Sequence, residues 1–235
     1  RLVLKTLNRD ELTANLSTIF SEYSIRLSCS TGYGRKHFSD SDIIKTEILC
    51  AAKGVSKFFS GAKNIIDIGG EDIKIIICDE KNNVNNFCLN DKCAAGTGLF
   101  ITEVAECAGI DISEMSCLAA NSDFKNELNS VCTVFAKTEI MQWMLSGIPV
   151  EDIARGIYIS VAGRVGKLRT DDSLPVYLTG GVISFHPYLK NLFQEKFKQK
   201  CEIVEAPQFV TSFGAALFAK KHFLLSAKKV AEEIK

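Results

Sequence analysis

Two kinds of apolar pattern alternate along the chain, and together they predict an α/β protein. Short apolar runs bounded by glycine or polar turns predict buried strands, at residues 64–68, 73–78, 84–89, 175–178 and 201–204. Apolar residues recurring every three or four positions predict helices, at residues 99–108, 112–120, 136–145, 153–168, 188–197 and 212–223. A hairpin signal between the second and third strands predicts an antiparallel start to a mixed sheet.

The first sixty residues carry three further signals. Leu12 and Leu16 lie on one face of an expected helix, and residues 25–29 alternate as a short strand. Ser41 is the expected N-cap of a helix whose apolar face runs to Phe59.

We expect a domain boundary near Asp91. Residues 1–90 would form a first lobe that is incomplete at its N-terminus, and residues 91–235 a second lobe that carries the candidate metal ligands. The C-terminal helix would pack back on the first lobe, where the small residues 214–216 allow a close approach.

Charge and cysteine content narrow the classes of function. Lysine plus arginine and aspartate plus glutamate number 28 each, which argues against non-specific nucleic-acid binding and offers no basic face to a membrane. No apolar run is long enough to span a bilayer. The nine cysteines include no C-x-x-C pair, so we expect reduced thiols and a cytoplasmic protein.

The stretch from Asn90 to Gly98 combines two chemistries. Cys93 lies three residues before a Gly-Thr-Gly turn that opens an expected helix, and Cys132 also precedes a helical pattern. Helix starts favour phosphate through their backbone N–H groups and dipole, and they favour the thiolate form of cysteine that binds metals. A [4Fe–4S] cluster needs four thiolates, so two per chain would require a symmetric dimer. The alternative is a capping glycine with two buried structural cysteines.

The remaining cysteines and the histidines receive simpler assignments. Seven cysteines lie in apolar patterns and are expected in the core: Cys29, Cys50, Cys78, Cys88, Cys107, Cys117 and Cys201. The three histidines lie near expected surface turns or ends and receive no role: His37, His186 and His222.

Two further glycine turns follow expected strands. In Asp67-Ile68-Gly69-Gly70-Glu71, glycines would let the backbone approach a phosphate, and a carboxylate would orient a Mg²⁺-bound or attacking water. Thr179-Gly180-Gly181-Val182 would clasp an adenosine or only turn into a helix. The first of these turns alone is also compatible with an ordinary hairpin bearing solvated acids. No P-loop sequence occurs, but the three glycine turns together indicate a nucleotide.

Together these stretches resemble the BadF/BadG/BcrA/BcrD ATPase family, whose best-known members are activators (component A) of 2-hydroxyacyl-CoA dehydratases. The matching stretches follow in order at residues 31–35, 67–71, 90–98, 132–136, 180–182 and 214–217. The resemblance implies the two-lobed acetate and sugar kinase/Hsc70/actin-like (ribonuclease H-like) fold, with ATP and Mg²⁺ between the lobes. It also implies a homodimer bridged by one [4Fe–4S] cluster.

The resemblance also implies roles for individual residues. Cys93 and Cys132 would hold the cluster, and Glu71 would be catalytic. The nucleotide would be bound by Asp67, Gly69, Gly70, Gly96, Thr97, Gly98, Gly180 and Gly181. The protein would be an ATPase coupled to electron transfer, accepting an electron from reduced ferredoxin or flavodoxin. Its partner would be a 2-hydroxyacyl-CoA dehydratase or a benzoyl-CoA-reductase-type enzyme.

The chain departs from the family pattern in several places. The family opens with a Gly-Ser/Thr-rich phosphate loop that is absent here, so we expect Arg1 to be a boundary within a longer protein. Glu71 replaces the usual glutamine, and Leu99 replaces the usual arginine. A non-hydrolysing cluster-binding homologue therefore stays open as an alternative. So does a sugar-type kinase of the same fold, although paired cysteines argue against it.

Overall fold

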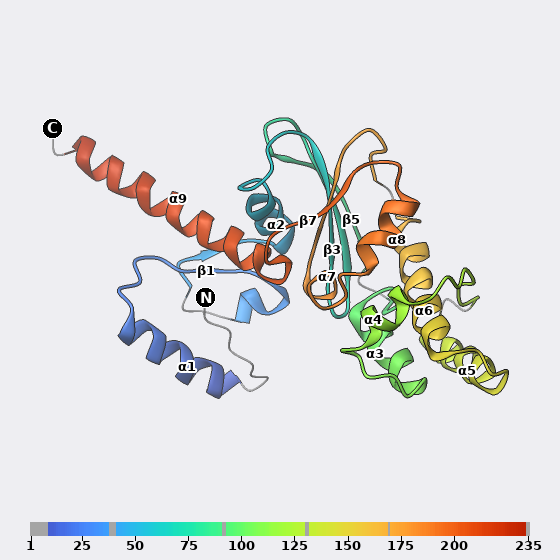
Figure 1. The fold of residues 1–235 in the computed structure, drawn as a ribbon. Helices are drawn as coiled ribbons and strands as arrows, with labels where there is room; N and C mark the ends of the chain where they lie inside the picture. The colour runs from blue at the N-terminus through green and yellow to red at the C-terminus, as the bar shows by residue number, and fades with distance from the viewer. Residues whose placement is uncertain (1–8, 38–40, 91–92, 130–131, 169, 234–235) are drawn as a thin grey trace.

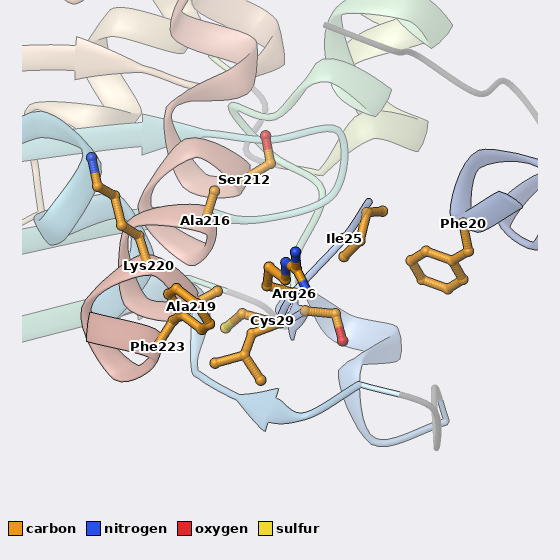
Figure 2. A pocket seen from close by; sticks show the side chains of 11 residues that line it. Phe20, Ile25, Arg26, Cys29, Ser212, Ala216, Ala219, Lys220 and Phe223 are labelled. Carbon is orange, nitrogen blue, oxygen red and sulfur yellow. The ribbon is translucent and has the colours of Figure 1, made fainter. Parts of the chain in front are cut away.

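A mixed five-stranded sheet forms the centre of the fold (Figure 1). The computed structural model describes residues 9–37, 41–90, 93–129, 132–168 and 170–233. In spatial order the strands are β5 (Val84–Asn90), β4 (Ile73–Cys78), β3 (Lys63–Ile68), β6 (Val176–Thr179) and β7 (Cys201–Ile203). The β3–β4 and β4–β5 pairs are antiparallel, and the β3–β6 and β6–β7 pairs are parallel. The expected strands and the antiparallel start of the sheet are confirmed.

Helices lie on both sides of this sheet (Figure 1). The described helices are α1 (Arg9–Glu22), which lies apart from the sheet in Figure 1, and α2 (Glu47–Val55), α3 (Gly98–Cys107), α4 (Met115–Ala120), α5 (Thr133–Leu145), α6 (Val150–Val165), α7 (Gly181–Phe185), α8 (Leu189–Lys196) and α9 (Val210–Glu233). A small parallel pair and two 3₁₀ turns complete the described elements: β1 (Cys29–Ser30), β2 (Ile43–Ile44), η1 (Tyr33–His37) and η2 (Pro207–Phe209).

Neighbouring residues of the central strand enter two different cores. Ile66 and Ile68 are buried in the larger core, which is completed by residues of α3 to α8. Ile65 is buried in the smaller core with Val55 of α2 and Val210 of α9. Successive strand residues point to opposite faces, and here both faces are covered. This explains why the sequence shows consecutive apolar residues, such as Ile65 and Ile66, rather than strict alternation.

The helices α2 and α9 pack with their backbones in close contact. A Cβ atom placed on Gly214 of α9 would lie 1.8 Å from the carbonyl oxygen of Cys50 in α2. A Cβ atom placed on Gly54 of α2 would lie 2.2 Å from the carbonyl oxygen of Val210. The close approach expected at residues 214–216 is therefore confirmed, while the C-terminal part of α9 extends away from the sheet (Figure 1).

Two expectations for the N-terminal region are wrong. The expected strand at residues 25–29 is reduced to Cys29–Ser30. The next helix does not follow Ser41, because Thr46 is its N-cap and accepts a hydrogen bond from the N–H of Leu49. Ser41 instead bonds the side chain of Ser30 (2.8 Å between the two Oγ atoms). Both residues suit an N-cap, and the tertiary contact of Ser41 decides between them.

The sheet takes strands from both sides of residues 90 and 91. A domain boundary near Asp91 stays a prediction. Asp91 itself lies outside the described residues. None of the described helices is long and apolar enough to cross a membrane.

The cysteine assignments are confirmed in part. Cys50, Cys78 and Cys201 are buried, and all nine cysteines are free thiols. Cys117 is exposed, so its assignment to the core is wrong. It lies on α4, whose buried residues are Met115 and Ala119. A residue two positions from each of these lies on the opposite side of a helix.

His186 is buried rather than at the surface, with 5% of its area exposed. Its Nδ1 atom shares a hydrogen bond of 2.7 Å with the hydroxyl of Tyr158 in α6. The Tyr158 hydroxyl also lies 3.3 Å from the hydroxyl of Ser116. Burial lowers the pKa of His186 to about 4 and raises the pKa of Tyr158 to about 12. His186 is therefore a neutral core residue that links α7 to α6.

The burial of His186 predicts that the folded protein loses stability in acid. The unfolded chain takes up a proton on His186 near its ordinary pKa of 6.5, whereas the folded chain resists until about pH 4. Folding stability should therefore fall as the pH drops, by about 2 kcal/mol between pH 7 and pH 5 from this residue. Urea unfolding should show that His186→Gln loses less stability over this interval than the wild type. The exposed His222 provides the control, and an equal effect of His222→Gln would contradict the assignment.

Candidate functional site

Three glycine turns meet at one edge of the sheet. The parallel strands β3 and β6 end together, with Asp67 paired to Thr179, and each strand is followed by a Gly-Gly pair. A Cβ atom on Gly98 would lie 3.2 Å from the Cα of Gly70 and 3.2 Å from Val182. A Cβ atom on Gly180, whose φ is +100°, would lie 2.3 Å from a β3 carbonyl oxygen. Glycine is thus required where these backbones touch.

Hydrogen bonds fasten α3 to the turn between β3 and β4. The N–H of Gly98 donates to the carbonyl oxygen of Gly69 (3.0 Å), and the N–H of Leu99 donates to that of Gly70 (2.7 Å). Two of the amides at the start of α3 are therefore already bonded within the chain. The positive end of the helix dipole still lies directly against the Gly69-Gly70 turn.

The Gly-Thr-Gly turn is held by its own hydrogen bonds. Thr97 is fully buried, and both its N–H and its hydroxyl donate to the carbonyl oxygen of Ala94 (2.9 and 2.6 Å). Gly96 has a φ of +88° and lies against Ile73 and Arg164. Thr97 therefore shapes the loop, and its side chain is engaged inside it.

Two acids of the first turn lie in opposite environments. Asp67 has 7% of its area exposed, whereas Glu71 is exposed at the tip of the turn. Burial is the largest influence on Asp67 and raises the pKa of its carboxyl to about 6. The nearby Lys74 opposes this rise, and the carboxylates of Asp72 and Glu47 add to it. Perturbed carboxyl groups of this kind gather at functional sites.

Lys74 is the centre of this acidic group. Its Nζ atom lies 2.7 Å from Asp72, 3.8 Å from Glu47 and 4.0 Å from Asp67. Burial opposes its charge, but the three carboxylates outweigh burial and raise the pKa of Lys74. Lys74 is not among the site residues that the sequence pattern predicts, although a lysine inside the apolar run 73–78 was the available signal.

Cys93 and Cys132 are both exposed thiols that precede packed helices. Cys132 is the N-cap of α5, and its carbonyl oxygen accepts from the N–H of Ala136 (2.9 Å). Cys93 precedes the loop that leads into α3, and Asn90 donates to its carbonyl oxygen (3.3 Å). The helices α3 and α5 pack together. Asp91 and Lys92, which belong to the same sequence stretch, lie outside the described residues.

The donors of this region are two thiols rather than a complete metal site. Among the described residues, no group of three or more histidine, cysteine or acidic side chains is placed to hold a metal ion. An ion pair between Lys137 of α5 and Glu103 of α3 joins the two helices near this region. Two accessible thiols, one at the N-cap of α5 and one in the segment before α3, suit a group that is completed by ligands from outside the chain.

Comparison with known proteins gives closely similar sequences and structures. The chain is 37% identical over 202 residues to the 2-hydroxyisocaproyl-CoA dehydratase activator of Clostridioides difficile, covering 85% of this chain and 76% of the relative. Its structure is similar to that of the activator of the 2-hydroxyisocaproyl-CoA dehydratase from Clostridium difficile with bound ADPNP. That match has a TM-score of 0.81 and 31% identity, and covers 95% of this chain and 84% of the other.

A more distant structural match concerns the fold alone. MreB5 of Spiroplasma citri, solved with AMPPNP, aligns with a TM-score of 0.55 and 13% identity, over 97% of this chain and 79% of that one. The mixed sheet and these matches confirm the expected actin-like α/β fold. The model of the BadF/BadG/BcrA/BcrD ATPase family matches residues 11–219. With nearly the whole sequence and fold in agreement, the chain belongs to the BadF/BadG/BcrA/BcrD ATPase family.

Proposed function

We propose that the protein is an ATP-dependent activator that passes one electron from a dimer-bridging [4Fe–4S] cluster to a partner enzyme. The partner would be a 2-hydroxyacyl-CoA dehydratase or a benzoyl-CoA-reductase-type enzyme, and reduced ferredoxin or flavodoxin would supply the electron in the cytoplasm. The observation that carries the proposal is a pair of exposed thiols: Cys132 is the N-cap of α5, and Cys93 lies in the segment that leads into α3, which packs against α5. The names of the similar proteins support the partner class.

The donor set fits an iron–sulfur cluster shared by two chains. Such a cluster requires four thiolates, and one chain offers Cys93 and Cys132. Both thiols are exposed, which leaves the two sulfur atoms accessible to a second copy. When bound, the cluster would supply one-electron chemistry. The chain's own part would be to present Cys132 at the N-cap of α5 and Cys93 in the segment before α3, two helices that pack together.

The glycine turns and the buried acid fit a nucleotide with Mg²⁺. Backbone at Gly69, Gly70 and Gly98 would lie against the phosphates, and Gly180 and Gly181 against the adenosine. Gly70 and Gly181 support this placement, because a Cβ atom on either would meet nothing within 4 Å. Magnesium prefers carboxylate oxygen and water, and Asp67 is the buried carboxylate at this edge. The exposed Glu71 would orient the attacking water.

The hydrogen bonds between α3 and the Gly69-Gly70 turn provide a route of coupling. A nucleotide that shifts this turn must shift the N–H groups of Gly98 and Leu99, which donate to it. The segment that enters α3 carries Cys93. Binding of ATP would thus bias the position of one cluster ligand, as a nucleotide-driven two-state element requires.

A non-hydrolysing cluster-binding homologue is the second candidate. It is favoured by the open environment of Glu71, which is exposed at the turn. Bound iron without phosphate release from ATP would identify it. A sugar-type kinase would instead transfer phosphate and hold no iron.

The first prediction concerns iron. Anaerobically purified wild-type protein should be a brown dimer with about four irons per dimer. Cys93→Ala and Cys132→Ala should each lose colour and iron, because each removes two of the four ligands from a symmetric site. Cys117→Ala is the matched control, since Cys117 is also exposed but lies outside both stretches. Full iron content in both variants would contradict the assignment of Cys93 and Cys132 as cluster ligands.

A second prediction concerns the nucleotide. A Cβ atom added at Gly181 meets nothing within 4 Å, so Gly181→Val should fold normally and yet project into the proposed adenosine site. Calorimetric titration with Mg·ADP should show at least a tenfold loss of affinity, about 1.4 kcal/mol. Gly34→Val, at another glycine with open space, should bind as the wild type does. Unchanged binding of Mg·ADP by Gly181→Val would contradict the proposed position of the adenosine site.

A third prediction follows from the buried Asp67. Its pKa is raised from 3.8 to about 6, so the folded chain holds the proton more tightly and loses stability as the pH rises through this interval. Keeping the carboxylate charged at pH 7 costs about 3 kcal/mol. Asp67→Asn should therefore stabilise the nucleotide-free protein at pH 7, with little effect at pH 4, in urea unfolding.

The same variant should weaken binding of Mg·ADP, because it removes the buried carboxylate proposed to face the cation. Lys74 keeps Asp72 as a partner at 2.7 Å in this variant. A less stable Asp67→Asn protein at pH 7 would show that the ion pair with Lys74 outweighs burial.

A further inference from the structure

Arg164 lies against the loop that follows Cys93, one of the two candidate cluster ligands. It belongs to the last turn of α6, a helix that packs against both α3 and α5. Its Cβ atom is 3.4 Å from the position that a Cβ atom on Gly96 would occupy. Its guanidinium carbon is 4.4 Å from the ring centroid of Phe100. The side chain is thus held along the loop that joins Cys93 to α3.

The charges around Arg164 include both ligand cysteines. Burial lowers the pKa of the Arg164 guanidinium, and negative charge on Cys93, Glu127 and Cys132 opposes that change. Arginine remains protonated at neutral pH in proteins. Arg164 therefore contributes a fixed positive charge within electrostatic reach of Cys93 and Cys132, in a partly desolvated position where charges act more strongly than in water.

We propose that Arg164 sets the reduction potential of the cluster held by Cys93 and Cys132, acting as a positioning charge rather than as a ligand. This inference rests on the proposed function. A cluster bound by four thiolates is anionic, and one-electron reduction adds a further negative charge. Net charge near a cluster is one determinant of its potential, so a nearby cation stabilises the reduced form. In a symmetric dimer each chain supplies one Arg164.

A purely structural role makes a different prediction. The contacts with Phe100 and Gly96 show that Arg164 also packs, and its removal could loosen the loop before Cys93. Loosening alone would lower iron content without a defined change of potential. A lysine at position 164 keeps the positive charge and loses the planar guanidinium, so it separates charge from packing.

The experiment is a redox titration of the full chain, followed by electron paramagnetic resonance. Wild type, Arg164→Gln and Arg164→Lys are reconstituted anaerobically with iron and sulfide, and dithionite is added with mediators. Arg155→Gln is the control, because Arg155 lies on the same helix but donates to Phe124 and Tyr188. At a fixed solution potential, Arg164→Gln should reduce the ratio of reduced to oxidised cluster about tenfold, a 59 mV fall for one electron.

Arg164→Lys and Arg155→Gln should stay within a factor of about three of the wild-type ratio. Loss of iron from Arg164→Gln counts for packing and overturns this inference, because loosening of the loop lowers iron content without a defined change of potential. Full iron in Arg164→Gln with an unchanged potential overturns this inference and leaves the proposed function standing. Loss of iron from both Arg164 variants also overturns it, in favour of packing. A wild-type protein that binds no iron refutes the proposed function and this inference together.

Discussion

The hydrogen bonds from the N–H groups of Gly98 and Leu99 to the carbonyl oxygens of Gly69 and Gly70 hold the site together. They join the end of the central strand to the start of α3, and glycine is what allows the two backbones to approach. With a Cβ atom at Gly98, the contact of 3.2 Å with the Cα of Gly70 could not be kept without a shift. The sheet edge, the helix dipole and the loop after Cys93 are thereby fixed relative to one another.

At the end of the central strand the chain keeps a group that opposes its own stability at neutral pH. Asp67 is buried although burial raises its pKa to about 6, and Lys74 only partly offsets that effect. His186 is also buried and uncharged, yet it shares a hydrogen bond with Tyr158 and connects two helices. Asp67 and His186 differ in how far their burial is compensated by a partner. A buried polar group with a full structural partner needs no further function, whereas an incompletely compensated carboxylate at a strand end indicates a ligand site.

The sequence was sufficient to predict features with local causes. The strands at 64–68 and 73–78 were predicted because a strand buried on both faces needs consecutive apolar residues, and the glycine turns because close backbone contact excludes side chains. Features that depend on distant residues were not predicted. Thr46 and Ser41 are equally good caps, and the contact of Ser41 with Ser30 is invisible in a linear pattern. The role of Lys74 depends on folding, which brings three carboxylates within 4.0 Å of its Nζ atom. The role proposed for Arg164 also depends on folding, which places it against the loop after Cys93.

The location of these charges bears on how a nucleotide could control an electron. The loop before α3 carries Cys93, and α3 is bonded to the Gly69-Gly70 turn, but Arg164 belongs to α6. A movement of α3 with the turn would therefore change the distance between Cys93 and Arg164 as well as the position of the thiolate itself. Because the interaction energy of two charges weakens as their separation grows, one shift would alter both the geometry and the reduction potential of a cluster. On the proposed function, nucleotide state and ease of reduction are then linked by the same backbone contact.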